Sequence, residues 1–79
     1  MSDDEPLLRA QLQVNERGAW KSVTRFFWRE AELHYVRTGV ERIALASGDP
    51  AHWRIITDSV HQKVLQRFTT ASGWQEPTL

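Results

Sequence analysis

Hydrophobic and polar residues alternate along residues 8–26, with one interruption at Asn15-Glu16-Arg17-Gly18. Asn at the first turn position and Gly at the fourth are typical of a three-residue hairpin loop with a Gly bulge. This loop pairs Asn15 with Ala19 and fixes the register outward from there. Because cross-strand partners share a face, the register predicts one largely apolar inner face: Leu8, Ala10, Leu12, Val14, Trp20, Ser22, Thr24 and Phe26. The opposite face carries Arg9, Gln11, Gln13, Lys21, Val23 and Arg25.

From Trp28 onward the apolar spacing changes to three or four residues, which predicts an amphipathic helix. Its first turns contain strong helix formers, Arg29-Glu30-Ala31-Glu32-Leu33. The apolar stripe consists of Leu33, Val36, Val40, Ile43 and Ala44. Ser47-Gly48 predicts the end of the helix, since Gly readily adopts the left-handed cap conformation.

Residues 51–68 fit two patterns. Asp49-Pro50 is a suitable N-cap and first position for a second helix, in which an apolar stripe would run from Trp53 to Phe68. The segment His52–Thr57 is instead rich in strand formers, Asp58-Ser59 resembles a turn, and Lys63–Phe68 is short and strand-like. We prefer two strands, because a four-stranded sheet covered by a helix is a more stable unit than an isolated hairpin.

These elements predict one small α+β domain over residues 7–68. Its architecture is ββαββ, a four-stranded antiparallel sheet with one helix packed on one face. The alternative is a β-hairpin followed by two helices. Residues 1–6 form an acidic segment and residues 69–79 a polar one, and since neither shows apolar periodicity we expect both to be flexible tails.

Length and composition favour a cytoplasmic protein. The chain has 79 residues and no cysteine, whereas secreted domains of this size usually depend on disulfides. It contains no apolar run of about 20 residues, the length needed to cross a membrane. Its acidic N-terminus lacks the hydrophobic core of a signal peptide. We expect a bacterial or phage origin and no membrane association.

No residue pattern in the chain predicts catalysis. The histidines, His34, His52 and His61, have no partner at metal-ligand spacing. Glu30 and Glu32 point in different directions from the predicted helix. The four glycines are scattered and form no phosphate-binding loop. We therefore predict a non-enzyme, with no catalytic, metal-binding or cofactor-binding residue.

Charge is balanced overall, with ten basic and ten acidic residues, but it is unevenly distributed. The predicted strands carry basic residues and no acid, while the acids lie in the tails, turns and helix. A single helix covers one face of the sheet, so we expect the other to be open and basic, able to bind phosphates or an acidic protein. Long basic side chains also keep sheets soluble without any such function. The residues concerned are Arg9, Lys21, Arg25, Arg54, Lys63 and Arg67.

Four tryptophans are many for a chain of 79 residues. Trp20 and Trp53 are expected in the core. Trp74 lies in the polar C-terminal segment, where it either folds back onto the domain or anchors a partner, because Trp is enriched at binding hot spots. Tyr35 and Leu45 project away from the apolar stripe of the helix. We predict Tyr35, Leu45 and Trp74 as partner-binding residues.

The sequence thus favours a small protein-binding accessory or regulatory factor. Its partner is another protein or, in a homodimer, a second copy of the chain. The alternative is a nucleic-acid-binding module that uses the basic sheet face. Balanced charge and few outward aromatic residues weigh against nucleic acid.

Overall fold

The structure is a computed structural model that describes residues 8–48 and 51–77. Within these residues it contains one helix and a five-stranded sheet. The elements, in chain order, are β1 (Arg9–Glu16), β2 (Ala19–Phe27), α1 (Glu30–Ser47), β3 (His52–Thr57), β4 (Val64–Thr69) and β5 (Gly73–Gln75). The predicted acidic tail, residues 1–6, and Asp49-Pro50 lie outside the described residues.

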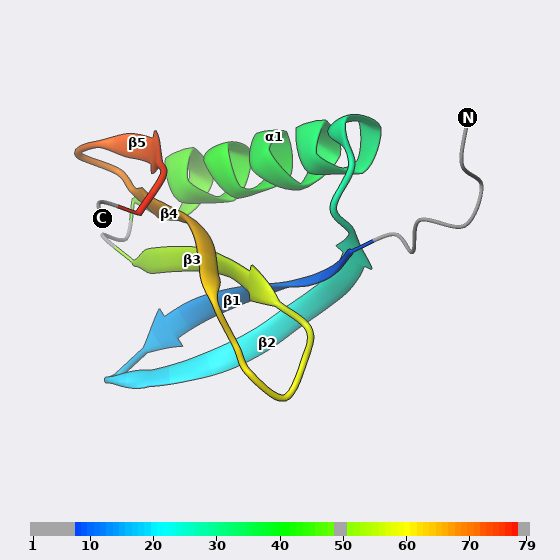
Figure 1. Cartoon of the computed structure of the whole chain (residues 1–79). Coiled ribbons are helices and arrows are strands. Elements are labelled where there is room, and N and C mark those ends of the chain that lie inside the picture. Colours follow the sequence, from blue (N-terminus) through cyan, green and yellow to red (C-terminus); the bar gives the residue numbers. More distant parts are fainter. Residues whose placement is uncertain (1–7, 49–50, 78–79) are drawn as a thin grey trace.

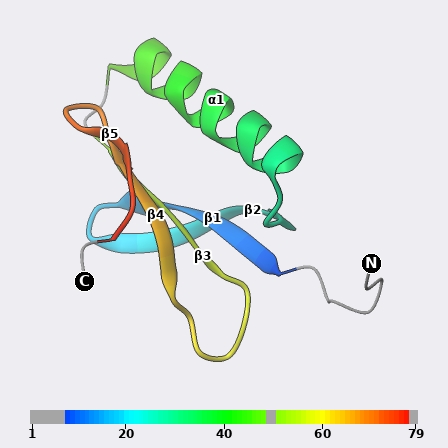
Figure 2. The same ribbon diagram turned by 45° about the horizontal axis from the view of Figure 1, so that its top comes forward.

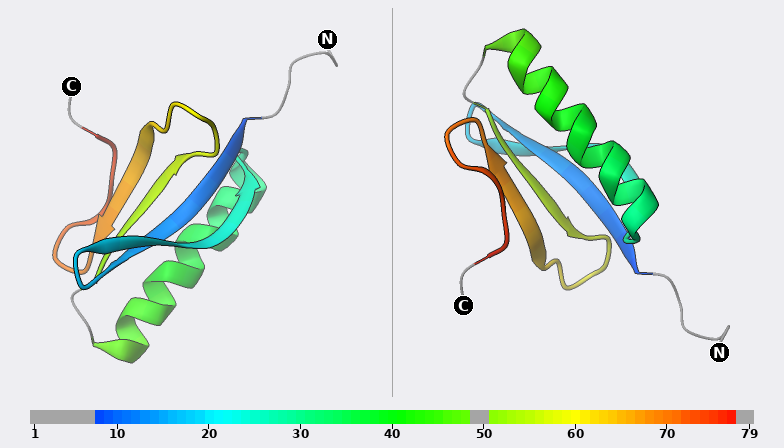
Figure 3. Two further views of the ribbon diagram at one scale, coloured as in Figure 1. Left: turned by 90° about the horizontal axis from the view of Figure 1, so that it is seen from below. Right: turned by 90° about the horizontal axis from the view of Figure 1, so that it is seen from above.

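The sheet is antiparallel throughout, and its strands lie in the order β2-β1-β3-β4-β5. Helix α1 forms a second layer on one face (Figure 1). Figure 2 shows the β3–β4 connection projecting on the side of the sheet away from α1. Seen from below in Figure 3, the strands lie in front of α1 and no described helix covers them. The sheet therefore has one packed face and one open face.

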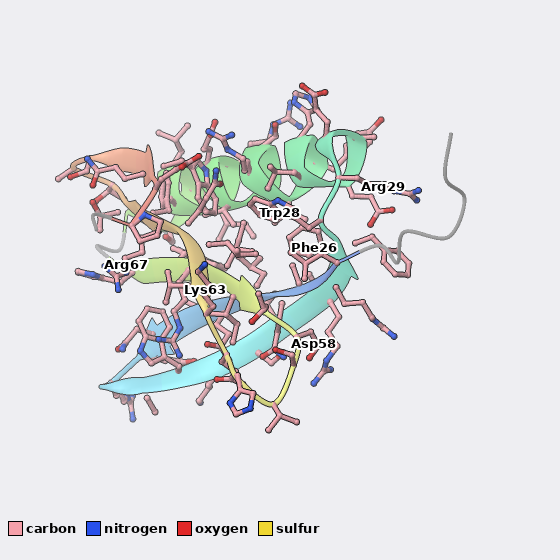
Figure 4. All side chains as sticks on the ribbon, viewed as in Figure 1. Phe26, Trp28, Arg29, Asp58, Lys63 and Arg67 are labelled. Atoms are coloured by element: carbon pink, nitrogen blue, oxygen red, sulfur yellow. The ribbon has the colours of Figure 1, made fainter. Side chains whose placement is uncertain are left out.

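The core lies between α1 and the centre of the sheet. Val40 and Ala44 of α1 pack against a cluster of strand residues: Ala10, Leu12, Trp53, Ile55 and Phe68. Phe26 and Trp28 close the same layer and point into the space between α1 and the sheet (Figure 4). Each large side chain buried in this way contributes about 1.5–3 kcal/mol to folding, so this layer is the main source of stability.

The predicted helix and its C-terminal cap are confirmed. Gly48 adopts a left-handed conformation with φ of 64°, and its N–H donates to the carbonyl of Ala44. The stripe is only partly buried, because Ile43 lies at the edge of the helix–sheet contact and is half exposed. The preference for two strands over residues 51–68 is also confirmed, by β3 and β4.

The number of strands was wrong, because segment 69–79, predicted as a flexible tail, contains β5. Gly73 has φ of 72°, which allows the chain to reverse tightly after β4. The Ser72 N–H donates to Thr69 Oγ1 in the same turn. Trp74 then pairs with Phe68, and their ring centroids lie 5.2 Å apart. A strand of three residues is too short to show periodicity, so it could not be recognised in the sequence.

The predicted hairpin register was wrong along the whole hairpin: Leu12 pairs with Thr24 instead of Ser22, and Ala10 with Phe26 instead of Thr24. The loop has two residues, Arg17 and Gly18, with φ of 55° and 84°, a combination typical of a type I′ turn. Trp20 consequently pairs with Asn15 instead of Val14, on the face opposite to the core. Beyond a bulge between Leu12 and Gln13, the residues of β2 lie again on the faces predicted for them, although their partners on β1 differ.

Candidate functional site

The open face is the sheet face opposite α1, and its members follow from the strand register because cross-strand partners share a face. We define it by Arg9, Gln11, Gln13, Asn15, Trp20, Ser22, Arg25, Phe27, His52, Arg54, Ile56, Val64, Arg67 and Gln75. One row of paired residues crosses all five strands: Ser22, Gln13, Arg54, Arg67 and Gln75. None of the residues in this definition is acidic.

Side chains on this face are linked into a continuous polar chain. Gln11 Nε2 donates to Asp58 Oδ1 over 3.3 Å, and Gln13 Nε2 donates to Gln11 Oε1 over 2.8 Å. Arg54 Nε donates to Gln13 Oε1 over 2.8 Å. Its guanidinium carbon lies 4.0 Å from the centroid of the Trp20 ring. Gln11 and Gln13 are buried although no described helix covers them. The polar chain that they form therefore holds Arg54 in one orientation.

Arg54 and Arg67 face each other directly on β3 and β4. Like charges in this position destabilise a sheet. Among the described residues, neither arginine forms an ion pair with an acid. Burial lowers the pKa of Arg54, and the nearby charge of Arg67 lowers it further. Both side chains remain charged at neutral pH, since arginine does not deprotonate in proteins.

The other predicted basic residues are placed differently. Arg9 and Arg25 lie on the open face, but Arg25 Nε is 3.3 Å from Asp58 Oδ2 and is partly neutralised. Lys21 pairs with Val14, which packs against the core, so it lies on the helix side, where Glu16 is 3.5 Å away. Lys63 lies outside the strands, in the loop before β4.

Two aromatic residues belong to the open face, Trp20 and Phe27. Trp20 is 36% exposed, and Arg54 lies against its ring. Phe27 has the guanidinium groups of Arg9 and Arg29 at 5.5 and 5.8 Å from its ring centroid. Sequence reasoning missed both aromatics and the glutamine chain. The alternating Gln11 and Gln13 were the available signal, since buried amides need partners.

The predicted partner-binding residues do not form one surface. Tyr35 and Leu45 are 76% and 85% exposed on the outer side of α1. Trp74 instead belongs to β5 and packs against Phe68, with Arg37 over its ring at 5.7 Å. Tyr35 and Leu45 are separated along the helix by Thr38 and Arg42, so the helix presents single apolar residues, which are common on protein surfaces.

A cavity of about 620 Å³ lies between the C-terminal end of α1 and the tip of the β1–β2 hairpin. It is lined by Val14, Asn15, Glu16, Arg17, Ile43, Ser47, Ala51, His52 and Trp53. Glu16 and His52 both border it, but no hydrogen bond joins them within the described residues. A general base needs a partner that orients it, and this cavity shows no such arrangement.

Within residues 8–48 and 51–77, no three His, Cys, Asp or Glu side chains lie close enough to hold a metal ion. In the same part of the chain, no helix has the length and apolar character to span a bilayer. Comparison with family models, curated proteins and solved structures gave no match for this chain.

Proposed function

We propose that the protein is a small, non-enzymatic binding module that attaches to an acidic segment of a partner protein through its open face. The observation that carries the proposal is the pair formed by Arg54 and Arg67, two directly opposed arginines that form no ion pair with an acid among the described residues. An arrangement that is unfavourable in the free protein becomes favourable once an anion lies between the two charges.

Preorganisation supports the same proposal. Arg54 is held by Gln13 and by the ring of Trp20, so less side-chain entropy is lost when it binds a carboxylate. The guanidinium plane also matches a carboxylate with two parallel hydrogen bonds. Glutamine and serine in the same row offer further polar contacts along an extended segment.

Nucleic acid is the second candidate, favoured by the contact between Arg54 and Trp20. Aromatic rings and arginine planes stack on bases in single-stranded nucleic acid. The face offers few such platforms, however, since Trp20 and Phe27 already carry guanidinium groups on their rings. Arg25 is in addition partly neutralised by Asp58. We therefore rank an acidic protein segment above nucleic acid.

The test compares binding of polyglutamate and of a single-stranded oligothymidylate to the wild type and to Arg54→Gln/Arg67→Gln. We expect polyglutamate to bind the wild type and to lose about tenfold or more in affinity in the double variant, because charge-assisted hydrogen bonds each contribute about 1.5–3 kcal/mol. Fluorescence anisotropy with labelled probes measures both affinities.

The matched control is Arg42→Gln, which removes a charge from the exposed side of α1. It should leave polyglutamate binding unchanged. Equal losses in Arg42→Gln and in the sheet variant would mean that only net charge matters, and the proposal would be wrong. Preferential binding of the oligonucleotide, weakening steeply with salt, would instead establish the second candidate. Tyr35→Ser/Leu45→Ser tests the helix residues in parallel.

A further inference from the structure

We infer that Arg54 and Arg67 form a subsite for one phosphate monoester, carried as a phosphorylated side chain on the acidic segment of the partner protein. The inference rests on the proposed function and makes it more specific. It concerns the chemical group that the centre of the open face recognises, and it follows from the charge and the free donors of the two arginines.

Charge balance favours a phosphate over a carboxylate. The two opposed guanidinium groups carry two positive charges, and a single carboxylate neutralises only one of them. A phosphate monoester carries about −1.5 to −2 charges at pH 7, which matches the pair. Its three terminal oxygens can also accept hydrogen bonds from both arginines at once.

Both arginines have donors to spare. The guanidinium of Arg54 uses Nε for Gln13 and one face for Trp20, so its two terminal nitrogens have no hydrogen-bond partner among the described residues. Arg67 is exposed and makes no side-chain hydrogen bond or ion pair with any described residue. Forked donors of this kind bind phosphate with two parallel hydrogen bonds.

Among the described residues, no acid forms an ion pair with either arginine of the subsite. Gln13 and Gln75 flank the pair within the row, and His52 lies two residues before Arg54 on the same face. The acid of the polar chain, Asp58, is bound by Gln11 and Arg25. It lies at the far end of that chain, whereas Arg54 lies at the end next to Trp20.

The experiment titrates the protein with phenyl phosphate and with benzoate at equal ionic strength, followed by NMR of the backbone amides and arginine Nε–H groups. These probes share an aromatic ring, so any difference reports the anion. We expect phenyl phosphate to bind about tenfold more tightly than benzoate. Arg67→Gln should remove this preference, whereas Arg42→Gln should retain it.

Thermal unfolding supplies a second readout that separates binding from structure. Without ligand and at low salt, Arg67→Gln should melt at a higher temperature than the wild type, because it relieves repulsion across β3 and β4. Phenyl phosphate should raise the melting temperature of the wild type and leave that of Arg67→Gln unchanged. A lower melting temperature for unliganded Arg67→Gln would show that Arg67 is structural and would overturn the inference.

The remaining outcomes distinguish the inference from the proposed function. Equal affinities for the two probes, with polyglutamate binding still dependent on Arg54 and Arg67, would overturn the phosphate subsite and leave the acidic-segment module intact. If neither probe nor polyglutamate depends on these arginines, both proposals are wrong. Tighter binding of oligothymidylate than of phenyl phosphate, lost in Arg67→Gln, would assign the subsite to nucleic acid and overturn its assignment to a phosphorylated protein.

Discussion

Trp74 and Tyr35 show how two residues predicted for the same role differ in their surroundings. Trp74 lies beside Phe68 and beneath Arg37, whereas Tyr35 is 76% exposed and its ring has an edge contact with the ring of His34. Aromatic packing of the first kind contributes to folding. Exposed apolar residues of the second kind contribute little to stability and are available to a partner.

We therefore expect Trp74→Ala to lower the free energy of unfolding by about 2 kcal/mol, below the range for fully buried tryptophans because this side chain is only half buried. Tyr35→Ala should change it by less than about 0.5 kcal/mol. Urea unfolding monitored by circular dichroism measures both values. Similar losses for the two variants would contradict this assignment, as would a neutral effect of Trp74→Ala.

At the scale of elements, Glu32 joins the end of β2 to the first turn of α1. Its carboxylate accepts a 2.7 Å hydrogen bond from the Phe27 N–H and a 2.8 Å hydrogen bond from Arg29 Nε. The hydrogen bond from Phe27, and to a smaller extent the one from Arg29, lowers the pKa of Glu32 below its usual 4.5. Because the carboxylate accepts a hydrogen bond from the Phe27 N–H at the exposed edge of β2, this N–H is not available for pairing with a strand of another chain.

A carboxyl whose pKa is lower in the folded state stabilises that state above its unfolded pKa, and the contribution disappears as pH falls through the folded pKa. Glu32→Gln should therefore be less stable than the wild type at neutral pH, and the difference should shrink steadily as the pH falls below 4.5. Urea midpoints across this pH range measure the effect. Glu41 forms no ion pair among the described residues, so Glu41→Gln is the control and should show no such trend. A difference between Glu32→Gln and the wild type that stays constant with pH would rule out this linkage.

The elements also show which local signals sufficed for prediction. The helix was predictable because a long apolar stripe ends at a glycine that caps it. The β1–β2 register was not, because Asn15-Glu16-Arg17-Gly18 fits both a two-residue and a three-residue loop. The two loops differ by one residue, and that difference moves Trp20 from one face to the other. Here Arg17 adopts a positive φ, which is uncommon for residues other than glycine.

At the scale of the whole molecule, the sequence indicated a basic face but not the pairing of Arg54 with Arg67 within it. The absence of acids along the predicted strands was enough to expect such a face. The opposition of Arg54 and Arg67 depends on the pairing of β3 with β4, which contains a bulge between Ile55 and Ile56. The neutralisation of Arg25 depends on Asp58, 33 residues away in the chain. Long-range pairing of this kind leaves no local trace in a sequence.

The two faces also restrict how the chain can associate with itself. A symmetric dimer places the same patch of both subunits in contact. Through the open face, such a dimer would place Arg54 and Arg67 of both subunits in one interface, and like charges across an interface oppose binding. A homodimer of this protein should therefore use the outer side of α1, where Tyr35 and Leu45 are exposed.

Sedimentation equilibrium tests this restriction. Raising the salt from roughly 0.1 M to roughly 1 M shortens the screening length from about 10 Å to about 3 Å, and we expect the molar mass of the wild type to stay the same. Arg54→Gln/Arg67→Gln should not increase it, and any dimer present should dissociate in Tyr35→Ser/Leu45→Ser. A dimer that forms only in high salt or in the arginine variant would place self-association on the open face, where it would compete directly with an acidic partner.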